Sequence, residues 1–174
     1  MTEKISGNLI IIGGAEDKKE DKEILKRVVK YLDKDNEKIL IATIATEYPE
    51  KSYENYYEVF TGLGVKNISQ LDISSREDAF KEENINLISE SNLLFFTGGD
   101  QLRITSMLGG TPIYDEIKKL CDRNGLIAGT SAGASVMSDT MIVQGEDDES
   151  PRKCTVKMSP GLGLVNNIII DQHF

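Results

Sequence analysis

The sequence is poor in the residues that build metal sites and disulfide frameworks. Its 174 residues include one histidine, two cysteines and no tryptophan. Cys121 and Cys154 stand far apart with no CxxC motif, which does not make a disulfide scaffold, so we expect reduced thiols. Zinc sites usually draw several ligands from Cys and His, and this chain offers only His173 as an imidazole. We therefore expect neither disulfide bonds nor a bound metal.

Positive charge and long apolar runs are scarce as well. Lys and Arg number 20 against 29 Asp and Glu, which gives a formal net charge of −9. Nucleic acids and anionic membranes bind clustered basic side chains, so neither is the expected partner. The N-terminal stretch does not resemble a signal peptide, because its apolar run, residues 9–12, is too short for a signal core or a membrane span. We expect a soluble, cytoplasmic protein.

Short apolar runs recur along the chain, with helical patterns between them. Several are apolar at consecutive positions, which is typical of strands covered on both faces. The runs are residues 8–12, 38–45, 68–73, 92–96 and 126–128, with 141–143 and 165–170 as candidates for further strands. Apolar residues at helical spacing predict helices at residues 24–32, 53–63 and 113–121, and a weaker one at 76–88.

This alternation predicts the α/β class, with a mostly parallel sheet and helices on both faces. The length fits one domain, and we see no repeat or linker that would divide residues 1–174. In open α/β sheets, ligands bind at the carboxyl ends of the strands. The turns that follow the apolar runs are therefore the places to look for function.

The turn after residues 126–128 has the pattern of a nucleophile elbow. Gly129-Thr-Ser-Ala-Gly133 fits G-x-S-x-G, between a predicted strand and a helical pattern. Such a turn exposes the hydroxyl of Ser131, and the following helix N-terminus directs backbone N–H groups, first that of Ala132, at a developing oxyanion. The alternative is a turn of small residues that packs closely or holds a phosphate.

Serine is a weak nucleophile unless a base takes its proton. The one histidine, His173, follows the apolar run 165–170, so we expect it at the edge of the sheet where Ser131 also lies. Outside a catalytic role it would be a surface or core histidine. A histidine base also needs a carboxylate to orient it, and the acidic stretch 146–149 lies between the two residues. Most of that stretch would otherwise be a solvated loop.

Two more glycine turns follow predicted strands. Thr97-Gly-Gly-Asp-Gln101 follows residues 92–96 and can supply a second N–H to an oxyanion, while Gln101 can reach a substrate. Gly13-Gly-Ala-Glu-Asp17 follows the first run. Neither turn fits a dinucleotide fingerprint or a P-loop. Taken singly, each is an ordinary turn between a strand and a helix.

Four stretches together resemble the cyanophycinases, in the serine peptidase family that also holds aspartyl dipeptidases. They are residues 11–18, 95–101, 129–135 and 161–174, and they span nearly the whole chain. The resemblance implies hydrolysis of the backbone amides of cyanophycin, a poly-aspartate polymer with an arginine on each side-chain carboxyl, to β-aspartyl-arginine dipeptides. It also implies a fold like the class I glutamine amidotransferase core, no metal or organic cofactor, and allows a homodimer.

The resemblance assigns roles residue by residue. It makes Ser131 the nucleophile and His173 the base. For the acid we choose Glu149 by its spacing, with Glu146 and Asp147 as alternatives. The N–H groups of Gly99 and Ala132 would form the oxyanion hole, and Gln101, Asp171 and Gln172 would line the substrate pocket.

The sequence departs from this family at its end. Family members continue past the histidine with a basic Arg/Gly-rich stretch and further strands and helices, whereas the printed sequence ends at Phe174. We therefore expect a peptidase domain truncated after the histidine. Two other functions stay open: an aspartyl dipeptidase of the same family, and a truncated, non-catalytic α/β domain that binds a peptide or a small anion at its glycine turns.

Overall fold

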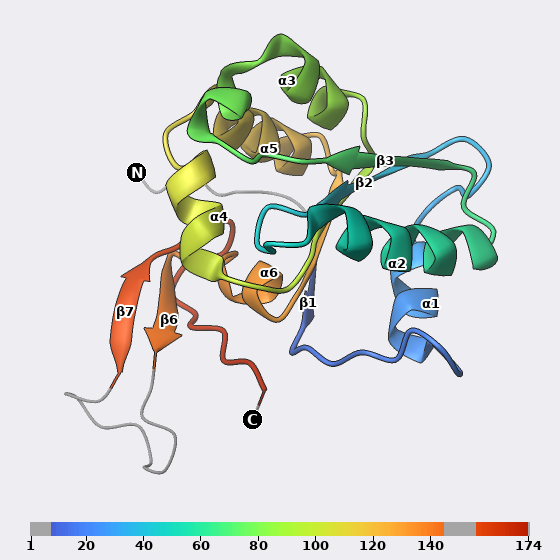
Figure 1. The fold of residues 1–174 in the computed structure, drawn as a ribbon, viewed down its shortest axis with the longest axis horizontal. Coiled ribbons are helices and arrows are strands. Elements are labelled where there is room, and N and C mark those ends of the chain that lie inside the picture. The colour runs from blue at the N-terminus through green and yellow to red at the C-terminus, as the bar shows by residue number, and fades with distance from the viewer. Residues whose placement is uncertain (1–7, 145–155, 174) are drawn as a thin grey trace.

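A five-stranded parallel sheet forms the centre of the computed structural model, which describes residues 8–144 and 156–173 (Figure 1). The strands lie in the order β1-β5-β4-β2-β3. Their bounds are β1 (Asn8–Ile12), β2 (Lys38–Ala42), β3 (Asn67–Leu71), β4 (Leu93–Phe96) and β5 (Leu126–Thr130). Two further strands, β6 (Thr140–Gln144) and β7 (Lys157–Pro160), pair antiparallel in a small separate sheet.

Helices cover both faces of the large sheet. Two lie on one face, α1 (Glu23–Val29) and α2 (Pro49–Gly62). The other face carries α3 (Glu82–Ser89), α4 (Gln101–Leu108), α5 (Pro112–Asp122) and α6 (Ala132–Ser135), together with the 3-10 helix η1 (Arg76–Phe80). Figure 1 shows α2 and α5 on opposite sides of β2 and β3. The predicted α/β class, with a mostly parallel sheet between two helical layers, is confirmed.

The core is divided by the sheet into two apolar clusters. In β2, Ile39 and Ile41 face the cluster under α1 and α2, whereas Leu40 and Ala42 face the cluster under α3 to α6. All four residues of β4 are fully buried. The central strands are therefore apolar at consecutive positions because both of their faces are covered.

Two expectations about secondary structure are wrong. Residues 165–170 form no strand: Val165 makes one isolated bridge to Ser138, and the remainder is irregular. Ile168 and Ile169 are half exposed there, Val165 is partly buried against the core, and Ile170 is buried in it. The weak helix predicted over 76–88 is two helices, because the extended backbone of Lys81 separates η1 from α3.

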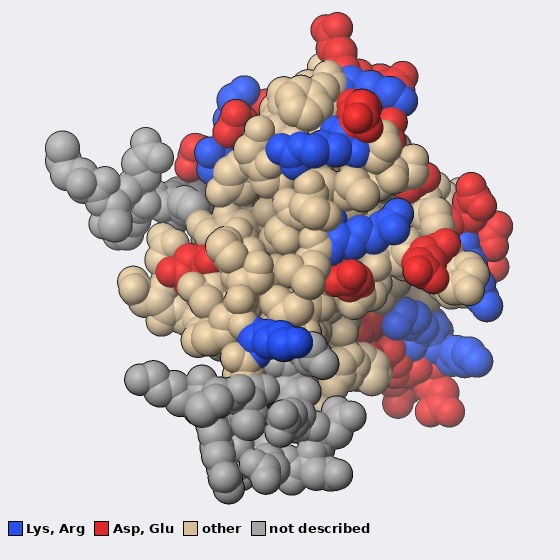
Figure 2. Space-filling view, turned by 60° about the vertical axis from the view of Figure 1, so that its left-hand side comes forward, with Lys and Arg blue, Asp and Glu red and all other residues tan. Residues whose placement is uncertain are grey.

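Charges of both signs are interspersed on the face of the molecule in Figure 2. Blue and red side chains neighbour one another along its margin, and a broad tan area between them carries few charges. Several of the described lysines pair with acids one helical turn away, such as Lys26 with Glu23 and Lys118 with Asp115. Within residues 8–144 and 156–173, no helix is long and apolar enough to cross a membrane.

Candidate active site

Three glycine turns meet at the carboxyl edge of the sheet. They follow β1, β5 and β4, which are neighbours in that order. In register, Ile12 at the end of β1 lies beside Thr130 at the end of β5, and Phe96 at the end of β4 lies beside Gly129. Turns that stand apart in the sequence are therefore brought together by parallel pairing, at the edge where α/β folds bind ligands.

Ser131 occupies a sharp turn between β5 and α6. Its backbone angles, φ 53° and ψ −119°, lie where a residue with a side chain rarely settles. Its N–H donates to the carbonyl of Ile12 at 2.9 Å, which ties the turn to β1. Small residues allow this geometry, because a Cβ on Gly133 would collide with the backbone of Phe96.

The structure brings Ser131 and His173 into hydrogen-bond contact. The Ser131 Oγ lies 2.7 Å from the Nε2 of His173. The histidine is held by its own N–H, which donates to the carbonyl of Gly13 at 3.2 Å. Its ring lies against Gly14, so closely that a Cβ there would overlap the imidazole. With the proton on Nδ1, Nε2 can accept the serine proton.

The turn after β4 stands beside the serine. A Cβ on Gly98 would lie 3.3 Å from the Cβ of Ser131 and 3.8 Å from its Oγ. Gly99 has a φ of +145°, and its Cα lies so close to the carbonyl of Ala45 that no side chain fits. Within the described chain, neither the N–H of Gly99 nor that of Ala132 has an acceptor. Both amides are free to donate to a ligand.

The fold and these turns agree with what comparison of the sequence shows. A family model described as Peptidase family S51 matches residues 9–174, which is nearly the whole chain.

The chain belongs to peptidase family S51.

Curated relatives of this S51 chain are named cyanophycinases. One from Geminocystis herdmanii (strain PCC 6308) is 34% identical over 100% of this chain and 64% of its own length. Another, from Trichormus variabilis (strain ATCC 29413 / PCC 7937), is 36% identical over 95% of this chain and 56% of its own length. The chain thus spans between about half and two thirds of the length of these relatives.

Solved structures share the fold. A peptidase from an acI-B1 Actinobacterium superimposes with a TM-score of 0.72 over 97% of this chain and 69% of its own, at 24% identity. A protein of Listeria monocytogenes EGD-e gives a TM-score of 0.66 over 91% of this chain and 75% of its own, at 18% identity. At these identities the likeness concerns the fold alone.

The residues expected to line a substrate lie in different surroundings. Gln101 is buried at the start of α4, and its Nε2 donates to the carbonyl of Ile142 at 2.9 Å. Asp171 is exposed and accepts from the N–H of Gln172. The Oε1 of Gln172 is buried without a hydrogen-bond partner among the described residues. Glu149, chosen as the acid, and its alternatives Glu146 and Asp147 lie outside the described residues.

Three residues of this region have no role that the sequence predicts: Gly14, Glu16 and Thr130. Glu16 is 5% exposed and accepts hydrogen bonds from Tyr56 and Thr130. The sequence feature that points to Gly14 and Glu16 is their place in the turn after β1. The feature that points to Thr130 is its position directly before Ser131. None of these signals shows that the side chains meet.

The electrostatics of Glu16 follow from its partners. Burial alone would raise its pKa, but hydrogen bonds from Lys18, Thr130 and Tyr56 outweigh burial and lower the pKa from 4.5. Because the folded-state pKa is the lower one, the carboxylate stabilises the fold at neutral pH, and that stability is lost as the pH falls through the folded-state pKa.

In the parts of the chain described, no group of three or more His, Cys, Asp or Glu could hold a metal ion.

Proposed function

We propose that this chain is a serine peptidase of the cyanophycinase type, which cleaves cyanophycin to β-aspartyl-arginine. The observation that carries the proposal is the 2.7 Å contact between Ser131 Oγ and His173 Nε2, at the meeting point of three glycine turns in an S51 fold. Cyanophycinases at 34–36% identity support the substrate. A chain with a net charge of −9 is also compatible with an arginine-bearing polymer.

In the proposed reaction Ser131 is the nucleophile on an elbow and His173 is the base. The Oγ attacks a backbone carbonyl carbon while Nε2 takes the hydroxyl proton. The tetrahedral intermediate collapses as Nε2 gives this proton to the leaving amine, which frees one product and leaves an acyl-enzyme. In the second half of the reaction Nε2 takes a proton from water as the water oxygen attacks the acyl carbon. The acyl–Oγ bond then breaks, Nε2 returns that proton to Ser131 Oγ, and the second product leaves as the carboxylic acid.

The two free amides beside Ser131 supply the oxyanion hole of this proposal. The N–H of Ala132 opens α6, and the N–H of Gly99 comes from the neighbouring turn after β4. Fixed N–H donors stabilise the negatively charged oxygen of the tetrahedral intermediate more than the neutral carbonyl oxygen of the substrate. They therefore lower the barrier to attack. The side chains of Gln101, Asp171 and Gln172 would line the substrate pocket. The buried Oε1 of Gln172, which has no partner among the described residues, could accept a hydrogen bond there.

Glu149 is the proposed acid, and mutation of the acidic stretch tests it. We expect Glu149→Gln to lower kcat on cyanophycin by about 10³–10⁴-fold, because an imidazole without its carboxylate loses the tautomer that accepts the serine proton. The matched controls are Glu146→Gln and Asp147→Asn, which should stay within about threefold of wild type. A large loss in one of the controls instead would move the acid to that residue.

The substrate is tested with wild-type protein on two substrates. Release of β-aspartyl-arginine from purified cyanophycin, followed by mass spectrometry, should be at least about tenfold faster than cleavage of a free Asp-X dipeptide, since binding of the polymer beyond the scissile bond contributes to kcat. The reverse preference would identify an aspartyl dipeptidase. If neither substrate is cleaved and a serine-directed phosphonate fails to label Ser131, the chain is a non-catalytic binding domain.

A further inference from the structure

Glu16 is a buried carboxylate that the proposed reaction does not use. Its side chain is 1% exposed. Its Oε1 accepts from the Tyr56 hydroxyl at 2.5 Å and lies 2.7 Å from the Nζ of Lys18, and its Oε2 accepts from the Thr130 hydroxyl at 2.5 Å. A buried charge is retained only where its partners satisfy it, and here both oxygens have partners.

The partners of Glu16 lie on separate parts of the fold. Tyr56 belongs to α2, and the centroid of its ring lies 4.8 Å from the centroid of the Phe95 ring in β4. Thr130 is the last residue of β5 and directly precedes Ser131. Glu16 itself lies in the turn after β1. The carboxylate therefore joins that turn both to α2 and to the strand that carries the serine.

The same turn holds His173. The carbonyl of Gly13 accepts the N–H of His173, and the imidazole rests on Gly14. Only Ala15, whose φ of 54° is in the left-handed region, separates Gly14 from Glu16. Such a short, conformationally restricted segment transmits a displacement of Glu16 to the surface on which the imidazole rests.

We propose that Glu16 is a positioning residue for the proposed serine peptidase reaction: by holding the Thr130 hydroxyl, it fixes the turn 13–16, and hence the His173 imidazole, at hydrogen-bond distance from Ser131. This inference rests on the proposed function. Among the described residues Glu16 bonds to neither Ser131 nor His173, so it acts through Thr130 and the turn. Reaction rates are sensitive to such placement, because a shift of about 1 Å can cost about 10²-fold.

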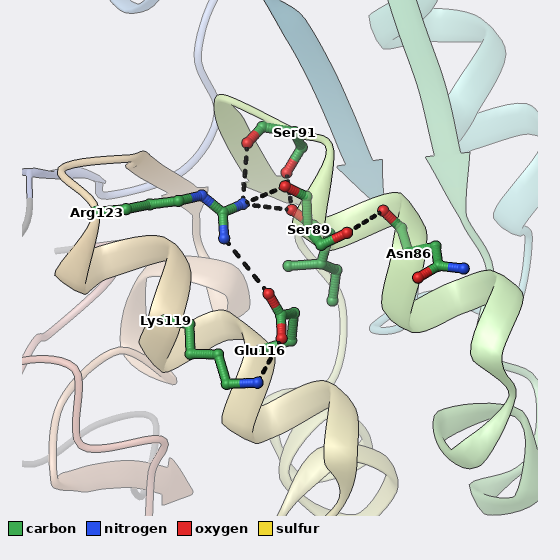
Figure 3. A network of polar contacts seen from close by, with 7 residues as sticks. Asn86, Ser89, Ser91, Glu116, Lys119 and Arg123 are labelled. Atoms are coloured by element: carbon green, nitrogen blue, oxygen red, sulfur yellow. Dashed lines mark hydrogen bonds and ion pairs between the residues drawn. The ribbon is translucent and has the colours of Figure 1, made fainter.

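A second buried carboxylate provides a matched control. Glu116 of α5 is 7% exposed, and its oxygens bond to the Nζ of Lys119 at 2.9 Å and to an Nη of Arg123 at 3.4 Å. Figure 3 shows this network, in which Arg123 also donates to carbonyls of Ser89 and Ser91. Ser91 stands just before β4 begins, so the network lies at the opposite edge of the sheet from Ser131.

The test follows the His173 ring directly. Because the chain has one histidine, its imidazole signals in a ¹H–¹³C or ¹H–¹⁵N NMR spectrum belong to His173 without assignment. We expect Glu16→Gln to shift or broaden these signals and to lower the rate of Ser131 labelling by a phosphonate about 10–100-fold. Glu116→Gln should lower the melting temperature while leaving both the His173 signals and the labelling rate as in wild type.

A second pair of variants keeps the test decisive if Glu16→Gln does not fold. Thr130→Val removes the hydroxyl that Glu16 holds, and Thr130→Ser keeps it. We expect Thr130→Val to displace the His173 signals and to slow the labelling of Ser131, and Thr130→Ser to recover most of the wild-type behaviour. Wild-type His173 signals in folded Glu16→Gln, or equal behaviour of Thr130→Val and Thr130→Ser, would overturn it.

The outcomes separate this inference from the proposed function. If wild-type protein cleaves no peptide but Glu16→Gln still displaces the His173 signals, the proposed function fails and the positioning of the imidazole by Glu16 stands. If wild type cleaves cyanophycin and Glu16→Gln leaves both the His173 signals and the rate of Ser131 labelling unchanged, the proposed function stands and the positioning role of Glu16 fails.

Discussion

Ser131→Ala is expected to lower the release of β-aspartyl-arginine from cyanophycin by about 10⁴-fold or more. The hydroxyl oxygen forms the acyl bond in the proposed reaction, and an alanine side chain has no atom that could form it. The fold should survive, because alanine and serine both carry a Cβ and are strained equally by the backbone angles of this turn. Among the described residues, the only side-chain hydrogen bond that the substitution removes is the one to His173. Dipeptide release, measured by mass spectrometry on matched amounts of folded protein, gives the result.

The control for this experiment is Ser106→Ala. Ser106 is exposed on α4, and its hydroxyl donates only locally, to the carbonyl of Arg103 at 2.9 Å. This variant should cleave cyanophycin at the wild-type rate and be labelled by the phosphonate, whereas Ser131→Ala should be neither active nor labelled. Dipeptide release by folded Ser131→Ala within tenfold of wild type would contradict the proposed mechanism.

The sheet was predictable from the sequence because burial on both faces leaves a strong local signal. Residues 93–96 are apolar throughout because both neighbours of β4 in the sheet and both helical layers cover it. Residues 8–12 are also a strand as expected, although Ile11 in β1 is 46% exposed. The helix α4 was missed, although Gln101, Ile104 and Leu108 recur at helical spacing and Asp100 caps its first turn. The pattern spans only eight residues and directly follows the glycines of the turn after β4, so it gives a weak signal for a helix.

The end of the chain shows the limit of local patterns. Three consecutive isoleucines, Ile168 to Ile170, indicated a buried strand, yet only Ile170 is buried. The path of this segment is set by contacts distant in the sequence: the Val165 carbonyl accepts from Asp139, and the His173 N–H donates to Gly13. His173 reaches Ser131 as expected, but along an irregular segment and with a left-handed φ of 57°.

The candidate site was only partly predictable for a related reason. The glycine turns and Ser131 carry recognisable motifs, so the sequence pointed to the edge of the sheet where they meet. A single Glu16 in a turn has no such signature, and a carboxylate in a connecting turn is ordinarily exposed. Its burial depends on Tyr56 and Thr130, which lie 40 and 114 positions away in the chain. Parallel strand order, rather than local sequence, brings these side chains together.

Gly14→Ala is expected to displace His173 and to slow both cyanophycin cleavage and phosphonate labelling of Ser131 by about 10²-fold or more. Gly14 has a φ of +114°, which L side chains rarely adopt, and its Cβ would occupy the space of the imidazole. The matched control is Gly13→Ala in the same turn, because Gly13 has no positive φ and its Cβ would meet nothing within 4 Å. Gly13→Ala should label at close to the wild-type rate. Equal labelling of the two folded variants would show that contact with Gly14 does not hold the imidazole in place, whereas slow labelling of Gly14→Ala alone would show that the turn after β1 is part of the active site.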